Sequence, residues 1–453
     1  EDRVLSDSSM QKGWDCLARF AERIRHFDPT RVRAVATQTL REARNREDFL
    51  TQGSKILGFP IEVISGIEEG RLIYQGVSHL LPHSNERRLV IDIGGRSTEI
   101  ISGSGYSPLH VASYRIGSVS SSLKHFKDGE FSAQAFHRAE VAAQAILDEA
   151  VSQFPQTDWD VVYGSSGTVG AVADVLSASG WTDSLITIES LEWLKKCLIR
   201  SGHVDRVHLE GLKEDRKAVI GGGISALIAV MNVLNIQSLK VALGALRQGL
   251  LFDMLERSDE ATDQREVSIR RLMRRFHVDT SQAQRVDQVA QFLFNQLAPI
   301  EHSKDAHRGT RRKLSWAAQL HEMGWVISHA DHHKHGAYII AHSEVLGFSD
   351  DELNRLGLLI LGQKGKLKKI NHDWSDERFC RMLLSLRLAI ILCHARSMPE
   401  IKEIKLRQLS GQVSFVLTLP SRWAIQYPQS AHLLKLEQQS WEKTSNTLEV
   451  NFT

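Results

Sequence analysis

Residues Leu89–Glu99 read LVIDIGGRSTE, and the organisation of the chain can be worked out from this stretch. An apolar strand leads to Asp92, and a pair of glycines then turns the chain into a second strand that starts at Ser97. Glycine permits positive φ and close approach, so such a turn can offer backbone N–H groups to phosphate oxygens while the aspartate holds Mg²⁺. A plain β-hairpin is the alternative, because short glycine motifs recur by chance. The full pattern D-x-G-G-x-S-T-E is more specific and favours a phosphate loop.

A second glycine turn, Tyr163–Thr168 (YGSSGT), follows a short predicted strand and opens a predicted helix. Helix N-termini attract phosphate, although an ordinary strand-to-helix turn explains this segment equally well. Two such loops suit a phosphate site between two α/β lobes.

Two further segments carry candidate chemistry. Ile64–Tyr74 (ISGIEEGRLIY) places Glu68 and Glu69 at the start of a helix directly after a strand. A carboxylate there could act as general base for water, and the alternative is favourable charge at a helix N-terminus. Thr37–Arg41 (TQTLR) ends another strand, and its threonines and arginine could bind phosphate. The alternative for that segment is a helix cap beside a surface arginine.

Strands and helices alternate over the first 255 residues, which predicts α/β layers. The expected strands are Val32–Ala36, Ile61–Ile64, Arg88–Ile93, Ser97–Ile101, Leu109–Tyr114, Val161–Val162 and Leu239–Ala242. The expected helices are Leu40–Thr51, Glu68–His79, Ala133–Phe154, Thr168–Ser177, Leu191–Ser201, Asp215–Leu234 and Ala245–Arg257.

The second half of the chain has a different pattern. Ser258–Arg265 (SDEATDQR) is polar without apolar periodicity and is a candidate linker. The pattern beyond it is helical as far as residue 398, after which Gln412–Leu419 alternates like a strand and His432–Thr444 is typical of a helix. We therefore expect a first α/β lobe at residues 1–75, a second at 76–258, a helical domain at 259–398 and a small C-terminal α+β domain at 399–453.

The composition of the 453 residues, 42% apolar and 24% charged, excludes a mainly disordered chain, a fibrous protein and a disulfide scaffold. A net charge of +2 excludes a basic field over the whole protein, and no nucleic-acid partner is expected. No apolar run reaches the roughly 18 residues of a membrane span, so no integral membrane segment is expected. The four separated cysteines, Cys16, Cys197, Cys380 and Cys393, indicate reduced thiols in a cytoplasmic protein.

Several motifs occur in the order in which a known family has them: ATQTLREARN, IEVISGIEEGRLIYQGV, LVIDIGGRSTEI, GSSGT and GALRQG. On these motifs the chain resembles the exopolyphosphatase / guanosine pentaphosphate phosphatase (Ppx/GppA) family, in its long proteobacterial form. The resemblance implies the actin-like, sugar-kinase-type two-lobed ATPase fold (the ASKHA fold). The segments WAAQLHEMGWVISHADHHKHGAYII and LGFSDDEL resemble the family's all-α HD-like domain, and the tail resembles its small final domain.

The resemblance also implies a role for each matching residue. Glu69 resembles the catalytic glutamate that activates water, and Asp92 and Glu99 the carboxylates associated with Mg²⁺. The implied phosphate contacts are Thr39, Arg41, Gly94, Gly95, Arg96, Ser97, Thr98, Gly164, Ser165, Ser166, Gly167 and Thr168. The implied activity is that of an exopolyphosphatase acting on the end of inorganic polyphosphate, with guanosine pentaphosphate as the alternative substrate. A homodimer in the cytoplasm is expected, either free or peripheral to the membrane.

The sequence departs from the family pattern in several places. The family's first phosphate loop, an Asp-Leu-Gly-Ser-Asn-Ser hairpin, is expected upstream of Glu1, so we interpret the sequence as a fragment. Arg96 stands where Gly or Ala is usual, and it either adds a phosphate contact or, if the turn needs positive φ, strains it. Leu243 and Gln248 replace an Asp or Gly and a Glu, which puts a metal or water role of that turn in doubt. A catalytically weak sensor of polyphosphate or of guanosine alarmones therefore stays open, as does a sugar-kinase-like phosphotransferase.

The helical region holds a histidine-rich stretch that includes His321, His329, His332, His333, His335 and His342. His321 is followed by Glu322, whereas true HD phosphohydrolases have Asp there as a metal ligand. We expect a structural HD-like domain without a working metal site.

Overall fold

The computed structural model describes residues 3–82, 84–181, 185–257, 262–297, 304–409, 414–442, 444 and 446–453. Their contacts group into two compact units, Glu1–Asp263 and Gln264–Thr453, which are described separately. The division falls within the predicted linker, of which residues 258–261 lie outside the described residues. The finer four-part division stays a prediction.

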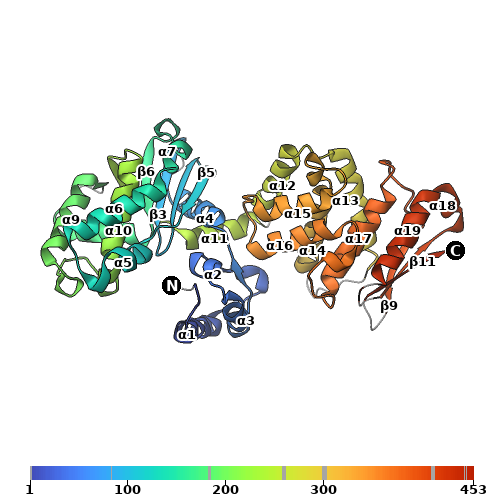
Figure 1. The fold of residues 1–453 in the computed structure, drawn as a ribbon, viewed down its shortest axis with the longest axis horizontal. Helices are drawn as coiled ribbons and strands as arrows, with labels where there is room; N and C mark the ends of the chain where they lie inside the picture. The colour runs from blue at the N-terminus through green and yellow to red at the C-terminus, as the bar shows by residue number, and fades with distance from the viewer. Residues whose placement is uncertain are drawn as a thin grey trace. The chain divides into compact units, whose positions relative to one another are not determined.

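A six-stranded sheet forms the centre of the first unit (Figure 1), with the strand order β5-β4-β3-β6-β8-β7. Strands β3, β6 and β8 are parallel, while β4, β5 and β7 run antiparallel to their neighbours. An antiparallel meander that continues into parallel strands confirms the predicted α/β fold of actin-like type. The strands are β3 (Arg87–Ile93), β4 (Thr98–Ser104), β5 (Ser107–Tyr114), β6 (Val161–Ser165), β7 (Leu185–Thr187) and β8 (Ser238–Val241).

Along β3 and β4 both faces of this sheet are buried. Successive side chains of a strand point to opposite faces, so each face has its own apolar cluster. Leu89 and Ile91 of β3 belong to a large apolar cluster with the helices of one face, whereas Val90 belongs to a smaller cluster with Ile73 and Tyr74 on the other. The helices that follow the sheet strands are α5 (Ser118–His125), α6 (Ala133–Leu147), α7 (Ala150–Gln153), α8 (Ser166–Ala178), α9 (Ile188–Ser201) and α10 (Glu214–Val233).

Helix α10 is, within the described ranges, the helix long and apolar enough to cross a membrane by length and composition. It packs against α5 and α6, and 67% of its apolar window is buried. Such burial is typical of the core helix of a globular domain.

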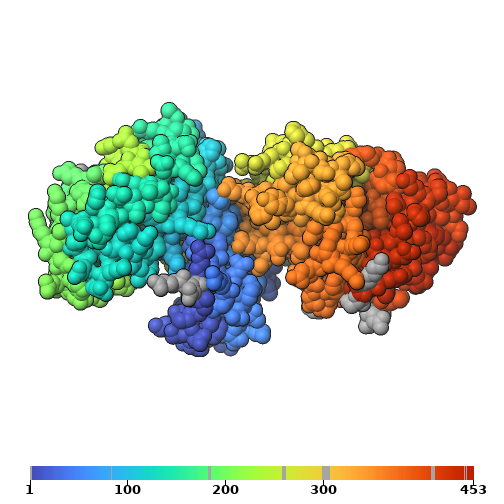
Figure 2. Space-filling model, in the orientation of Figure 1, coloured from blue at the N-terminus to red at the C-terminus, as the bar shows by residue number. Residues whose placement is uncertain are grey.

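The N-terminal part of the first unit is small and carries a two-stranded parallel sheet. Its core consists of Ala36, Leu57, Phe59, Ile61 and Val63. In Figure 2 its blue atoms project from the teal and green atoms of the six-stranded part. Its elements are α1 (Asp7–Ile24), β1 (Ala34–Ala36), α2 (Gln38–Glu42), α3 (Arg46–Leu57) and β2 (Ile61–Val63).

Two helices, α4 (Gly66–His79) and α11 (Leu246–Glu256), cross with their backbones in contact. A Cβ added to Gly249 would lie 2.6 Å from the carbonyl carbon of Leu72, and one added to Gly76 would lie 2.7 Å from the amide nitrogen of Gly249. A Cβ on Gly244 would lie 2.8 Å from the amide nitrogen of Val77. Only glycine fits at these three positions, so both glycines of the sequence GALRQG are required for helix packing.

The second unit is helical in its first part and ends in a three-stranded sheet with the order β11-β10-β9. One apolar cluster runs from Ile269 in the helices to Val450 in the sheet, so the two parts share a core. The helices are α12 (Gln264–Arg275), α13 (Thr280–Phe294), α14 (Lys304–Gln319), α15 (His332–His342), α16 (Asp350–Gly362), α17 (Glu377–Leu392), α18 (Ser421–Gln426) and α19 (Pro428–Trp441). The strands are β9 (Lys405–Leu409), β10 (Ser414–Leu419) and β11 (Thr447–Phe452).

Some predicted elements differ from the structure. The predicted helix 40–51 is two helices, because the side chain of Asn45 exchanges hydrogen bonds of 2.8 and 3.0 Å with the backbone of Leu5 and so interrupts the helix. The predicted helix 133–154 is divided into α6 and α7 at Asp148 and Glu149. The short strand β7, the serine-rich α5 and the first helix α1 were not predicted from the sequence, although the apolar residues of α1 recur at helical spacing. Residues 412–413 and 443 of the predicted C-terminal elements lie outside the described residues.

We expect Gly249→Ala to lower the free energy of unfolding by roughly 1–3 kcal/mol or more, because overpacking forces two backbones apart. Thermal unfolding of the variant measures this. Gly170→Ala is the matched control, since a Cβ there meets nothing within 4 Å inside α8. The control should unfold at or slightly above the wild-type temperature, because alanine is favoured over glycine in a helix. Equal unfolding temperatures for Gly249→Ala and the wild type would contradict the close crossing.

Candidate active site

Strand alternation brings two predicted carboxylates to the same face of the sheet. Asp92 lies two residues after Val90 on β3, and Glu99 lies two residues before Ile101 on β4; Val90 and Ile101 both pack toward α4. Asp92 and Glu99 are also direct partners across the two strands. The strand period of two therefore places both carboxylates toward the helix that carries Glu69.

The Asp92 carboxyl is buried at the end of β3, opposite Ser165 of β6. Burial raises its pKa to about 6, and the hydroxyls of Ser165 and Ser166 offset part of that effect. A carboxylate in this position is available to a hard cation that shares its remaining ligands with water and phosphate.

The glycine turn after Asp92 is held from outside by the start of α5. The carbonyl of Gly94 accepts from Ser118, and the carbonyl of Gly95 accepts from Val119 at 2.8 Å and from Ser120 at 3.0 Å. Gly94, Gly95 and Arg96 all lie outside the positive-φ region, so Arg96 does not strain the turn in that way. The glycines serve close packing instead, because a Cβ on Gly95 would lie 3.3 Å from Val119.

The predicted phosphate contacts of this turn differ in their surroundings. Arg96 is exposed, and its guanidinium bonds to none of the described residues. Ser97 is buried, and the hydroxyl of Thr98 donates to the carbonyl of Ile116 at 2.7 Å. Thr98 therefore holds the turn, and Arg96 is free to meet a ligand.

The second glycine turn, residues 164–168, begins α8 beside β3. Ser166 has φ +79, an uncommon conformation for a residue with a side chain. Thr168 donates to the carbonyl of Ile93 at 2.8 Å, and Ser165 donates to the carbonyl of Gly244 at 2.9 Å. The turn is thereby tied both to the Asp92 strand and to the segment before α11.

Arg216, at the start of α10, is a site residue that the sequence analysis missed. A Cβ on Gly167 would lie 2.7 Å from Nη2 of Arg216, so the guanidinium lies against the second glycine turn. Within the described part of the chain this guanidinium has no hydrogen-bond or ion-pair partner. Its sequence position, 49 residues after Gly167, gave no local signal.

Glu69 lies in the first turn of α4 and is only 8% exposed. Its Oε2 is 3.5 Å from Nη1 of Arg41, which also donates to the carbonyl of Ile64 at 2.6 Å. Burial raises the pKa of Glu69 to about 7; Arg41 and Thr37 act against this rise, and Asp92 adds to it. Thr37 thus lies at the site, whereas the predicted Thr39 is exposed and its hydroxyl bonds to no described residue.

Glu99 is 1% exposed and accepts a 2.7 Å hydrogen bond from Ser113. Burial, and then the charges of Glu69 and Asp92, raise its pKa well above the usual value. Glu69, Asp92 and Glu99 therefore repel one another in a buried place. A Mg²⁺ ion fits this charge and the oxygen donors, although no cluster of three or more His, Cys, Asp or Glu ligands occurs among the described residues. Magnesium binding by Asp92 and Glu99 stays a prediction.

The turn before α11 has no catalytic geometry of its own. Leu243 is 86% exposed, and the Gln248 side chain accepts a 3.2 Å hydrogen bond from the backbone of Ala245. Gln248 caps the helix, so its amide oxygen is occupied.

The histidine-rich part of the second unit is also bonded internally. His321 Nδ1 lies 2.7 Å from the carbonyl of Ala318, and the Glu322 carboxylate accepts from Arg396 at 2.9 and 3.1 Å. The carboxylate that replaces the HD aspartate is thus neutralised by an arginine. The expected lack of a metal site there stays a prediction.

A buried carboxylate beside an arginine, facing two glycine turns on an actin-like sheet, is typical of proteins that transfer phosphoryl groups. The chain belongs to the Ppx/GppA phosphatase family. The model of that family matches residues 1–258, and the model of Ppx/GppA phosphatase domain III matches residues 264–439.

Solved structures resemble the chain over a little more than half its length. An exopolyphosphatase-like protein is 24% identical with a TM-score of 0.51, and the match covers 57% of this chain and 87% of that one. An Aquifex aeolicus member of the Ppx/GppA family is 25% identical over 57% of this chain and 85% of its own, with a TM-score of 0.46. An exopolyphosphatase from Cytophaga hutchinsonii is 21% identical over 56% and 83%, with a TM-score of 0.49. The first of these supports the fold.

The raised pKa of Glu99 has a consequence for stability. A carboxyl whose pKa is higher in the folded state stabilises the fold below its unfolded pKa, and that contribution is lost as pH rises through the folded pKa. We expect Glu99→Gln to unfold at a higher temperature than the wild type at pH 8.5, with a smaller difference at pH 5.5. Paired thermal unfolding scans at the two pH values measure this. A difference that does not grow with pH would contradict the buried, repelled state of Glu99.

Proposed function

We propose that the protein is an exopolyphosphatase that releases the terminal phosphate of inorganic polyphosphate. The observation that carries this proposal is the buried Glu69 carboxyl, whose pKa of about 7 lies close to the pH at which a base works best. Its neighbours Arg41, Asp92 and the two glycine turns are groups that bind phosphate oxygens and a cation.

In the proposed reaction a water molecule attacks the terminal phosphorus, and its proton passes to a carboxylate oxygen of Glu69. The bond from phosphorus to the bridging oxygen breaks, and the shortened polyphosphate leaves with that oxygen. Arg41 offsets charge on the transferred group next to Glu69, and Arg96 and Arg216 hold phosphate oxygens at the two turns. A Mg²⁺ ion at Asp92 supplies further charge neutralisation when bound.

Guanosine pentaphosphate is the second candidate substrate, because it ends in the same kind of phosphoanhydride. Val119, which packs on Gly95, remains 37% exposed beside the phosphate turn. Such an apolar surface suits a nucleoside better than a bare polyphosphate. Phosphate release from the two substrates under one set of conditions would separate them. Mg²⁺ dependence, a homodimer and a cytoplasmic location stay predictions.

Glu69→Gln should lower turnover by about 10²-fold or more, because the amide keeps the shape but takes no proton. Polyphosphate binding should be nearly unchanged. Phosphate release and filter binding with the full-length protein measure the two effects. The matched control is Glu47→Gln, an exposed carboxylate on α3, which should keep wild-type turnover. Turnover above a tenth of the wild-type value in Glu69→Gln would remove Glu69 as the base.

Arg96→Gly should raise KM for polyphosphate about tenfold with a smaller change in kcat, since a charge-assisted contact to bound phosphate contributes about 1.5–3 kcal/mol. The effect should shrink as salt is added, because polyanion binding releases counterions. Steady-state kinetics at two salt concentrations test this. An unchanged KM at both concentrations would show that Arg96 does not touch substrate.

A further inference from the structure

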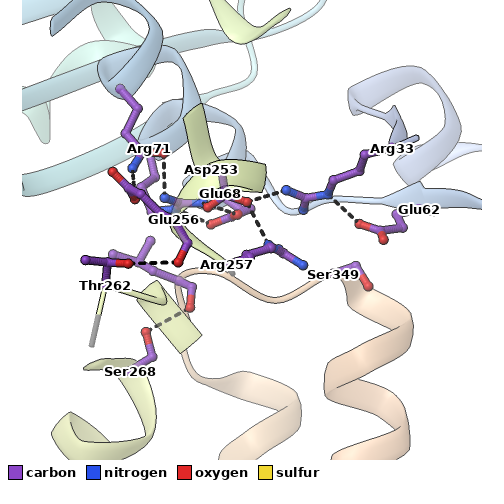
Figure 3. Close-up of polar contacts among 12 residues, drawn as sticks. Arg33, Glu62, Glu68, Arg71, Asp253, Glu256, Arg257, Thr262, Ser268 and Ser349 are labelled. Carbon is purple, nitrogen blue, oxygen red and sulfur yellow. Dashed lines mark hydrogen bonds and ion pairs between the residues drawn. The ribbon is translucent and has the colours of Figure 1, made fainter. Parts of the chain in front are cut away.

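The adjacent glutamates of α4 have separate environments, and Glu68 belongs to a buried charge network centred on Asp253 of α11 (Figure 3). Arg71 donates to both oxygens of Glu68 at 2.8 Å and to Oδ1 of Asp253 at 2.5 Å. Arg33 and Arg257 both bond to Oδ2 of Asp253, the latter at 2.8 Å. Asp253 therefore accepts from three arginines that come from different parts of the chain.

The network continues at both ends. Arg33, just before β1, also donates to Glu62 of β2 at 3.1 Å. Arg71 donates to Gln75 at 2.8 Å, and Gln75 donates to Glu256 of α11 at 2.6 Å. One carboxylate thus connects the N-terminal two-stranded sheet with α4 and α11.

We propose that Asp253 is a positioning residue of the catalytic site. It holds the first turn of α4 and the N-terminal sheet in the relative position that brings Arg41 next to Glu69. Arg41 follows β1, and Glu69 follows β2 and is the direct neighbour of Glu68. The elements that carry Arg41 and Glu69 are therefore connected to each other through Asp253. The inference rests on the proposed role of Glu69.

The charges make this link rigid. Glu62, Glu68 and Asp253 balance the three arginines, and Asp253 is 1% exposed. Burial alone would raise the pKa of Asp253, but Arg71, Arg257 and Arg33 outweigh burial and hold that pKa below its ordinary value. Removing one charge leaves a buried arginine uncompensated, so the surrounding elements must move to let water reach it.

A small movement at this place affects catalysis more than binding. The Arg41–Glu69 distance of 3.5 Å is already at the limit of a charged hydrogen bond, and a displacement of about 1 Å can lower a rate by as much as 10²-fold. The glycine turns proposed to bind phosphate lie at β3, β6 and α8. Ser165 of the second turn bonds to the carbonyl of Gly244, which precedes α11 and is not a member of the Asp253 network. Displacement of α4 should therefore lower kcat and leave KM nearly unchanged.

The test uses the full-length protein and phosphate release from a short inorganic polyphosphate. Asp253→Asn should lower kcat about 10-fold or more with KM within about twofold of the wild type. In the Glu69→Gln background the same change should lower the residual turnover no further, because the base that it positions is already absent. Glu437→Gln is the matched control: it breaks a buried arginine pair with Arg387 in the other unit and should lower the unfolding temperature while kcat stays unchanged.

Several outcomes would overturn the proposal. Wild-type kcat in Asp253→Asn at a lowered unfolding temperature would reduce the network to a stabilising role, and an equal further loss in the double variant would show that Asp253 acts independently of Glu69. If Asp253→Asn fails to fold, Arg71→Lys must show the same fall in kcat. Lysine keeps the positive charge but cannot make the several hydrogen bonds of the guanidinium. Full turnover in Glu69→Gln alone overturns the proposed function itself, whereas an inactive Glu69→Gln beside a normal Asp253→Asn overturns only the role of Asp253.

Discussion

The backbone contact between α4 and α11 is the constraint on which the first unit depends. Because Gly76, Gly244 and Gly249 lack side chains, the two helices approach until amide and carbonyl groups touch. Because the helices lie so close, Asp253 of α11 is within hydrogen-bond distance of Arg71 of α4. On another side of α4, Ile73 and Tyr74 pack against the sheet. Helix α4 is thus held by packing on one side and by charge on another, and its first turn can present Glu69 in a fixed direction.

The sheet supplies Asp92 and Glu99 to the site, because the side chains of a strand alternate between its two faces. Because both faces of the sheet are buried at β3, the residues from Leu89 to Ile93 are apolar except for one. Asp92 is that residue, and it shares a face with the apolar Val90. The serine and threonine hydroxyls around it bond to backbone carbonyls, which fixes the two glycine turns. Among the described residues, the guanidinium groups of Arg96 and Arg216 have no hydrogen-bond or ion-pair partner.

The sequence predicted most of the sheet and named most residues of the candidate site, because strands with continuous apolar runs and glycine turns are local signals. It did not reveal the break at Asn45, whose cause is a bond to Leu5 forty residues earlier. Arg216 and Asp253 were missed for the same reason: each is an ordinary charged residue in a helical pattern, and only the folded chain brings it to Gly167 or to Arg71. Neither glycine of the first turn has positive φ, and a Cβ on Gly95 would lie 3.3 Å from Val119 of α5, so space favours glycine there.

The two buried charge systems of α4 differ in one respect that explains their separate roles. Asp253 is surrounded by arginines, its pKa is lowered, and its charge is fully compensated within the protein. Glu69, Asp92 and Glu99 lie together, and Arg41 is bonded to Glu69. Burial raises all three pKa values, and repulsion between carboxylates adds to the rise for Glu69 and Glu99. A compensated network resists change and therefore suits a scaffold. An uncompensated one stores unfavourable electrostatic energy, which a cation or the uptake of a proton relieves, and a group that readily takes up a proton near neutral pH is what a general base must be. The neighbouring residues Glu68 and Glu69 show how one helical turn can serve both purposes.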